Sequence, residues 1–346
     1  MRSRSTQKLV YLQNTYRAWR NGDSTRIEDE NLLAACSGPF LTNHPRLAQF
    51  SIFLNLPLEL QHEVFRNVDR NDLKALSQTC VVLRALIIPF IMERVILCGN
   101  SPRLDLVVQT LEATMSNSKE AAGLVRRIDL PNDDTVSDIL ARLLPLTTKL
   151  SSLAYGYTVA EYSGGPDMID APRISRLLTP VQHSLTHLSI TYRLCLNQCD
   201  CGGDPCVLGW CSLEHMDALK SLQITFSILL GSSATKAPKL AHILPPGIVK
   251  LWLESDPWEI DPSNWNHEQR FGVLAEFVRN RNWEQFTPRL KVLHYNMEFL
   301  LEYWPNETAD TEMRLEEMMH ENGLECYGGP PIDPPISCYD DFYGEQ

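Results

Sequence analysis

Five cysteines fall within 17 residues of the chain, and thiolates at this density can hold a zinc ion tetrahedrally. The spacings contain no C-x-x-C knuckle, and Gly202-Gly203-Asp204-Pro205 marks a loop inside the group. Two interpretations stay open, a zinc site and a loop of free thiols, and the second is favoured. The cysteines are Cys195, Cys199, Cys201, Cys206 and Cys211, with His183, His187 and His215 as candidate helpers.

Motifs for other chemistry are incomplete or missing. His62-Glu63 and His267-Glu268 each begin like a zinc-protease motif, but neither has the second histidine at the required place. The chain contains no G-x-S-x-G, no phosphate-binding glycine loop and no dinucleotide fingerprint. Trp252, Trp258 and Trp265 cluster near two prolines, where we expect them to cap a core more often than to anchor a ligand. These observations leave an enzymatic function without positive support, and we predict that the protein needs no cofactor.

Composition limits the classes of partner. The 346 residues include 31 Lys and Arg against 43 Asp and Glu, so 31 minus 43 gives a net charge of −12. Such a chain repels phosphate backbones, which argues against nucleic-acid binding. The longest apolar run, 85–92, is too short for a bilayer and contains Pro89. We expect no membrane association, a cytoplasmic or nuclear location and reduced cysteines. The basic first twenty residues are read as a solvated arm, with a mitochondrial presequence as the alternative.

The segment 54–97 has the period of short amphipathic helices. Pro57 stands where a helix begins, and Asp69-Arg70-Asn71-Asp72 separates two apolar series. A segment this short buries little apolar area when it folds. The unit therefore needs a neighbouring domain or a partner to cover its remaining apolar surface. The first series is Leu60, Val64 and Val68, and the second is Leu73, Leu76, Cys80, Leu83 and Ile87, before Pro89 interrupts.

From residue 92 onward the pattern apolar-x-x-apolar-x-apolar occurs seven times, at spacings of 33, 25, 35, 34, 29 and 42 residues. Helical patterns lie between several of these matches. Strand followed by helix at such intervals is typical of a solenoid, and an irregular α/β domain is the alternative. The middle apolar positions are Val95, Ile128, Leu153, Leu188, Leu222, Leu251 and Leu293, and one predicted helical face comprises Leu104, Val107, Val108, Leu111 and Met115.

These patterns predict four parts. They are an N-terminal arm at 1–50, a helical domain at 51–98, a repeat-like strand and helix domain at 99–326, and a proline-rich flexible tail at 327–346. A final helix over Thr311 to Asn322, ended by Gly323, is expected to cap the last repeat.

The helical segment resembles the F-box family. The features in order are Leu56-Pro57-Leu58-Glu59-Leu60, Val64-Phe65, Asp72-Leu73, Leu76, Thr79-Cys80 and Leu83. The following region is similar to the leucine-rich repeats found behind an F-box, notably in fungal proteins. It departs from them at the asparagine five residues after each middle apolar position. Asparagine stands there once, as Asn100, and the other repeats have Asp133, Thr158, Arg193, Ser227, Asp256 and Glu298.

The resemblance implies an α/β protein that serves as the substrate-recognition subunit of a Skp-cullin-F-box type ubiquitin ligase. Its F-box-like helices would bind a Skp-type adaptor, which bridges to a cullin scaffold, and its irregular leucine-rich-repeat-like solenoid would bind a protein substrate of unknown identity. The alternatives are an interaction scaffold without a ligase role and, less favoured, a zinc-dependent enzyme. The candidate adaptor-binding residues are Leu56, Pro57, Leu60, Val64, Phe65, Leu73, Leu76 and Leu83.

Overall fold

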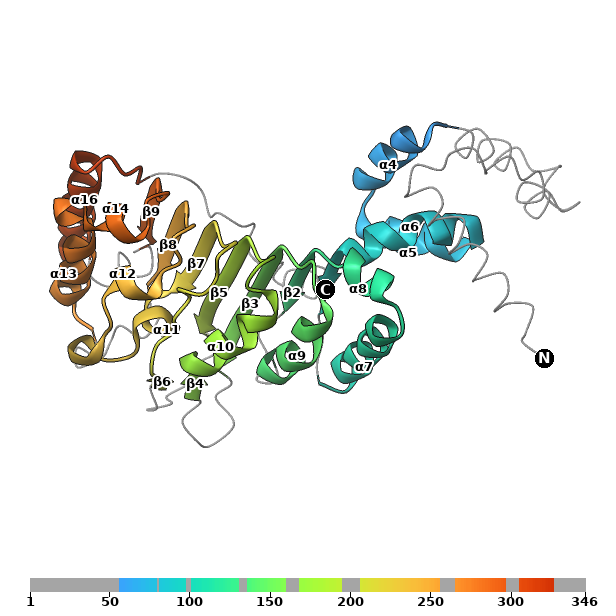
Figure 1. Ribbon diagram of the computed structural model, residues 1–346, viewed down its shortest axis with the longest axis horizontal. Helices are drawn as coiled ribbons and strands as arrows, with labels where there is room; N and C mark the ends of the chain where they lie inside the picture. Colours follow the sequence, from blue (N-terminus) through green and yellow to red (C-terminus); the bar gives the residue numbers. More distant parts are fainter. Residues whose placement is uncertain are drawn as a thin grey trace, which may run out of the picture. The chain divides into compact units, whose positions relative to one another are not determined.

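The computed structural model describes residues 56–79, 81–97, 101–130, 136–159, 168–194, 206–255, 265–296 and 305–326. The predicted arm at 1–50 and tail at 327–346 lie outside these ranges. The chain divides into two compact units, Met1–Glu93 and Arg94–Gln346. We call their described parts the helical unit and the sheet unit (Figure 1). The finer four-part division remains a prediction.

The helical unit comprises α4 (Leu58–Arg66), α5 (Arg70–Thr79) and α6 (Val81–Glu93). Pro57 is the residue before the first helix, and its carbonyl oxygen accepts hydrogen bonds from the backbone N–H groups of Leu60 and Gln61. One small core joins the three helices. Its buried members are Phe65, Leu73, Leu83 and Ile87, and the partly buried side chains packed against them are Val68, Leu76, Leu86, Phe90 and Ile91.

The third helix does not stop at Pro89. The sequence predicts an interruption there, but α6 continues through this residue to Glu93. Proline lacks an N–H group, so the hydrogen bond to the carbonyl of Ala85 is lost. Ile87, which precedes it, is fully buried, and Phe90 and Ile91, which follow it, pack against the core. This packing compensates for the lost hydrogen bond, because side-chain burial supplies most of the stability of a helix in a folded protein.

The sheet unit is built on a seven-stranded parallel sheet whose strand order follows the chain. A second, two-stranded parallel sheet pairs β4 (Met168–Asp170) with β6 (Cys206–Leu208). The strands of the large sheet, in spatial order, are β1 (Arg94–Ile96), β2 (Arg127–Leu130), β3 (Ser152–Val159), β5 (His187–Leu194), β7 (Ser221–Thr225), β8 (Lys250–Glu254) and β9 (Val292–Asn296).

The predicted apolar positions align in register across this sheet. The seven middle positions pair one with the next from β1 to β9, so they form a single row. Each is nearly or fully buried. Two residues further along the strands, Leu130, Tyr155, Ile190, Ile224, Leu253 and Tyr295 form a second buried row. The predicted strand positions are therefore confirmed, because residues two apart on a strand face the same side.

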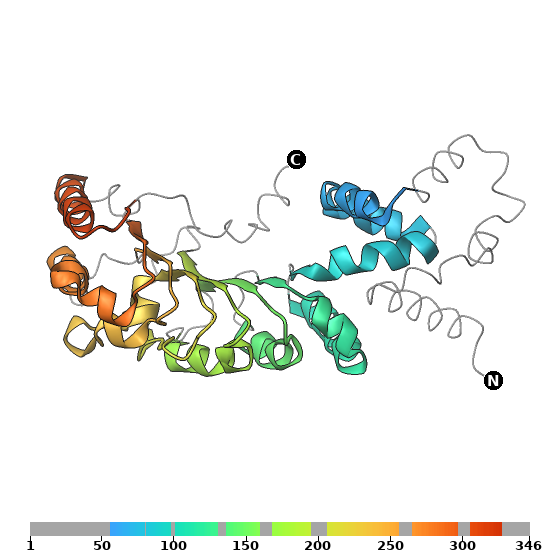
Figure 2. The same ribbon diagram turned by 45° about the horizontal axis from the view of Figure 1, so that its top comes forward.

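Helices cover the face of the sheet that carries these rows, as Figure 2 shows for the segments between the strands. The α-helices of this unit are α7 (Ser101–Asn117), α8 (Lys119–Leu124), α9 (Val136–Leu143), α10 (Ala171–Leu178), α11 (Phe226–Leu230), α12 (Leu240–Ile243), α13 (His267–Val278), α14 (Asn282–Phe286) and α16 (Pro305–Glu321). Short 3-10 turns lie at η2 (Leu144–Leu146), η3 (Thr179–Val181), η4 (Ala234–Lys236) and η5 (Arg279–Arg281).

Two predicted helices need adjustment. On α7 the side chains of Leu104, Val108 and Met115 are buried, but Val107 is 45% exposed, so it does not belong to the buried face. The last helix, α16, begins at Pro305, six residues before the predicted start. Its predicted end is confirmed, because Gly323 follows with a φ of 77°, a left-handed conformation that favours glycine after a helix.

The predicted α/β class is confirmed, with a helical segment first and a parallel sheet after it. The narrower interpretation as an irregular leucine-rich-repeat-like solenoid stays a prediction. Of the positions where regular repeats carry asparagine, Ser227 has a described side chain, and it lies buried in α11.

Candidate binding surfaces

The helical unit exposes large apolar side chains beside its small core. Leu60 and Val64 lie one helical turn apart on α4, and their side chains are 52% and 42% exposed. Ile88 on α6 is also exposed, at 41%. A spacing of four residues places Leu60 and Val64 next to each other on one face of the helix. This face is apolar, accessible and held by a folded unit, which are the properties of a protein-binding helix.

Polar contacts fix α4 and α5 in this unit. Gln61 is buried, and its side-chain amide donates to the carbonyl oxygen of Leu56 at 2.8 Å. His62 packs edge-on against the ring of Phe90, with 5.0 Å between centroids. Burial lowers the pKa of His62, and the neighbouring Arg66 lowers it further, so this imidazole is neutral at neutral pH. Arg70 donates from α5 to the carbonyl of Ile91, at 3.1 Å. These contacts position the exposed side chains on a defined surface.

The eight predicted adaptor-binding residues fall into two environments. Phe65, Leu73 and Leu83 are buried in the core, where they cannot contact a partner without unfolding. The other five reach the surface to different extents. Pro57, Leu60 and Val64 are exposed, and Leu56 and Leu76 are partly buried. Whether any of them binds an adaptor stays a prediction, and the exposed group is the one able to make direct contact.

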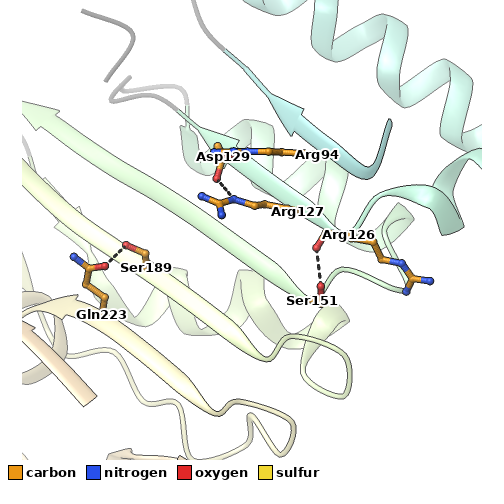
Figure 3. Close-up of polar contacts among 7 residues, drawn as sticks. All are labelled: Arg94, Arg126, Arg127, Asp129, Ser151, Ser189 and Gln223. Carbon is orange, nitrogen blue, oxygen red and sulfur yellow. Dashed lines mark hydrogen bonds and ion pairs between the residues drawn. The ribbon is translucent and has the colours of Figure 1, made fainter. Parts of the chain in front are cut away.

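Across the sheet unit, polar side chains alternate with the buried apolar rows and join one strand to the next. Ser189 on β5 donates to Gln223 on β7 at 3.3 Å (Figure 3). The amide of Gln223 donates to Glu254 on β8 at 2.8 Å, and Asn296 on β9 donates to the other oxygen of Glu254 at 2.7 Å. The chain of contacts therefore crosses four neighbouring strands.

A buried ion pair stands at the other end of the same face. The carboxylate of Asp129 on β2 accepts from Arg94 on β1 at 2.6 Å and from Arg127 on β2 at 2.8 Å (Figure 3). The Asp129 side chain is 3% exposed, while both arginines keep partial access to water. Burying a carboxylate is costly unless charged donors satisfy it, and two guanidinium groups do so here.

Aromatic side chains differ in their roles. Trp265 is buried, donates from Nε1 to the carbonyl of Gly231 at 2.8 Å, and meets Phe226 edge-on at 4.9 Å. It packs in the core, as the sequence favours. Trp252 is only partly buried, and its ring lies 3.8 Å from that of His294 between centroids. Trp258 lies outside the described residues.

One member of the cysteine cluster, Cys211, has a side chain that the structure describes. The side chains of Cys195, Cys199, Cys201 and Cys206 lie outside the described set. Cys211 is fully buried, Ser175 donates to its sulfur at 3.4 Å, and burial raises the pKa of its thiol to about 12. Among the described residues, no three histidine, cysteine or acidic side chains group as metal ligands would.

Two of the three candidate histidines of that cluster, His183 and His187, contact other polar groups, while the Nε2 atom of His215 is buried without a hydrogen-bond partner among the described residues. His183 is exposed and its Nδ1 lies 3.3 Å from a carboxylate oxygen of Asp217. His187 begins β5 and its Nδ1 lies 2.8 Å from the hydroxyl of Thr186. Neither contact requires a metal.

Comparison with known families identifies the helical segment. The family model of the F-box domain matches residues 53–88. The resemblance is thus confirmed for this segment, which covers a small part of the chain, and an F-box domain suggests an adaptor role in an SCF-type ubiquitin ligase. A search of curated proteins found no match for this chain. None of the helices that the structure describes combines the length and apolar composition that a bilayer crossing requires.

Proposed function

We propose that this protein is the substrate-recognition subunit of an SCF-type ubiquitin ligase. The observation that carries the proposal is the pair Leu60 and Val64, which stays exposed on α4 of a segment that matches the F-box domain. F-box domains typically bind Skp-type adaptors, and F-box proteins are generally non-catalytic. The apolar face of α4 is the surface that we assign to the adaptor, with Pro57 at its N-terminal end.

In this proposal the sheet unit binds the substrate. Parallel strands arranged in chain order, with helices on one face, support an irregular leucine-rich-repeat-like solenoid. Such a unit would hold a protein near the ubiquitin-carrying enzyme, which the adaptor and a cullin scaffold bring into the complex. The contribution to catalysis is then proximity, supplied to a reaction that another protein performs.

The test is capture of a purified Skp-type adaptor by the full chain. We expect the wild-type chain to bind, and Leu60→Asp/Val64→Asp to lose binding by a factor of about 100 or more, because truncating or charging central apolar anchors costs roughly 2 kcal/mol or more each. The matched control is Leu106→Asp/Val107→Asp on α7, which charges two exposed apolar residues of the sheet unit, 64% and 45% exposed.

Three results would count against the proposal. They are failure of the wild-type chain to capture the adaptor, capture that survives Leu60→Asp/Val64→Asp, and equal loss in the control. Retention of another partner after deletion of residues 54–97 would instead favour a scaffold without a ligase role.

A further inference from the structure

Basic side chains follow one edge of the large sheet. Because all seven strands are parallel, their N-terminal ends lie along the same edge. Each strand from β2 to β9 carries a basic residue at this end or just before it. We name this set the basic edge, and it consists of Arg126, Lys149, His187, Lys220, Lys250 and Lys291.

Backbone hydrogen bonds hold the basic edge in a fixed order. Ser151 donates to the carbonyl of Arg126, Thr186 to Ser151, and Lys220 to Thr186, at 2.8–2.9 Å. The series continues through Val249 to Lys291, at 2.7 and 2.9 Å. Arg126 also donates from its side chain to the carbonyl of Lys149 at 3.2 Å. Figure 3 shows Arg126 and Ser151 at the N-terminal ends of neighbouring strands. The side chains therefore start from a continuous and rigid backbone ladder.

The charges of this edge are close to one another and accessible. Burial lowers the pKa of His187, and the nearby charges of Lys220, Arg127 and Lys250 lower it further. The side chains of His187 and of the four lysines are exposed. Within the described part of the chain, no ion pair joins a carboxylate to any of these four ammonium groups. Asp217 pairs with His183 instead, and Asp129 pairs with Arg94 and Arg127.

Clustering like charges is unfavourable unless an opposite charge is bound at least part of the time. The feature is notable in a chain whose net charge is −12. We infer that the basic edge binds an extended, acidic segment of the substrate protein. This inference rests on the proposed role of the sheet unit in substrate binding.

Geometry sets the length and charge density of that segment. From β2 to β9 there are five steps between strands, and at about 4.8 Å each they span roughly 24 Å. An extended peptide advances about 3.3 Å per residue, so seven or eight residues cover the edge. The edge presents about one cation per step, which requires a dense run of carboxylates. Exposed lysines are suited to this role, because they act as flexible point charges without a demand for bidentate geometry.

The protein's own residues 327–346 are a competing occupant. The described chain reaches Cys326, and Glu325 donates from its backbone to the carbonyl of Lys291 at 2.8 Å, at one end of the basic edge. However, these twenty residues contain only four acids, Asp333, Asp340, Asp341 and Glu345. A run of acids from another protein matches the spacing of the cations better.

The experiment measures binding of a fluorescent octaglutamate peptide to the full chain at an ionic strength of about 0.1 M. The test variant is Lys220→Glu/Lys250→Glu and the control is Lys119→Glu/Lys236→Glu, two exposed lysines in helical segments that do not begin a strand. Each double change moves the net charge from −12 to −16, since each Lys→Glu step changes it by two. We expect the test variant to bind roughly tenfold or more weakly and the control to stay within about twofold of wild type, because screened surface charges act over about 10 Å.

Several results would overturn the inference. They are an absence of octaglutamate binding, an equal loss in both variants, and tighter binding of a single-stranded RNA octamer at the same lysines. Binding that emerges only after deletion of residues 327–346 would assign the edge to the chain's own segment instead. If Lys220→Glu/Lys250→Glu lowers the melting temperature of the protein, Lys220→Gln/Lys250→Gln, which adds no negative charge, is used in its place. Adaptor capture is scored separately, so a failed peptide assay with normal capture rejects this inference and leaves the proposed function standing.

Discussion

The helical unit and the sheet unit differ in the size of the core that accompanies their exposed apolar residues. In the helical unit four side chains are buried, while Leu60, Val64 and Ile88 remain exposed. In the sheet unit, rows of apolar side chains run without a break across seven strands and are almost completely buried by the helices on one face. The first unit exposes apolar side chains beside a core of only four residues. The second unit has an extended core, although it also exposes Leu106, Val107, Leu208, Trp210 and Met313.

This difference determines what each unit can bind. An exposed apolar face on a short helix gains free energy when a partner covers it, at about 25 cal/mol per Å² of apolar surface removed from water. The sheet unit instead offers polar and charged groups held by a rigid ladder, which give specificity and steering more than raw affinity. A hydrophobic docking segment joined to an electrostatic recognition surface is consistent with a protein that binds one constant partner and one variable partner.

The largest expected effects come from removing one core side chain in each unit. Phe65→Ala removes the largest side chain from the core of four, and we expect a loss of about 3–5 kcal/mol. A unit with so small a core has little stability to lose, so it should unfold and adaptor capture should disappear. Leu188→Ala, in the middle of the first apolar row, is the counterpart and should cost about 2–5 kcal/mol.

Two measurements separate the units. Six of the seven tryptophans, among them Trp210, Trp252, Trp265 and Trp283, belong to Arg94–Gln346, and Trp19 belongs to Met1–Glu93. Urea unfolding in a Trp19→Phe background, followed by tryptophan fluorescence, therefore reports on the sheet unit. Phe65→Ala should leave this transition unchanged and abolish capture. Leu188→Ala should shift the transition and preserve capture. If either variant affects both readouts, the units are coupled and the contrast drawn here is wrong.

The apolar part of both units could be predicted from the sequence. A strand places residues two apart on one face, so the pattern around Leu153 or Leu222 defines which positions point into the core. The F-box resemblance rests on a similar series. What periodicity cannot supply is the extent to which each position is covered. Val64 and Phe65 are neighbours in one motif, yet one is exposed and the other is in the core.

The polar surfaces could not be predicted because they depend on pairing between strands. The hydrogen bonds that link Ser189, Gln223, Glu254 and Asn296 join residues 31–42 positions apart in the chain. Only the register of the sheet brings these residues together. A signal for the basic edge does exist. A basic residue precedes the middle apolar position by one or two residues at Ile128, Leu188, Leu222, Leu251 and Leu293. With the strands assigned, this offset is enough to find it.

A smaller effect tests how much the buried polar contacts on this face of the sheet contribute to stability. Asp129→Ala removes the carboxylate that joins Arg94 and Arg127, and leaves two partly buried guanidinium groups without it. We expect a loss of roughly 1–3 kcal/mol, because charged hydrogen bonds are worth about 1.5–3 kcal/mol and both arginines can still reach water.

The control for this change is Asp138→Ala, which breaks an ion pair of similar length with Arg173, at 2.7 Å. Both partners of that pair are exposed, so the loss should stay below about 1 kcal/mol. Chemical denaturation of both variants, followed by tryptophan fluorescence, gives the comparison. Equal losses would mean that burial of the Asp129 ion pairs adds nothing to the stability of the sheet unit.

The smallest predicted effect concerns His187 and pH. Burial lowers its pKa, and Lys220, Arg127 and Lys250 lower it further, while a hydrogen bond with the backbone of Ser151 opposes them. The folded pKa is thus below the ordinary 6.5, so the unfolded state takes up this proton first and stability decreases as the pH falls below about 6.5.

A bound acidic peptide opposes the lysine charges and raises the pKa of His187, so peptide binding should strengthen over the same range, where glutamates remain ionised. His187→Gln should flatten both pH profiles between about pH 7 and 5.5, and His320→Gln, on the exposed part of α16, should not. An unchanged pH profile of octaglutamate affinity in His187→Gln would show that this histidine does not contribute to the basic edge, and the edge would then consist of the lysines and Arg126 alone.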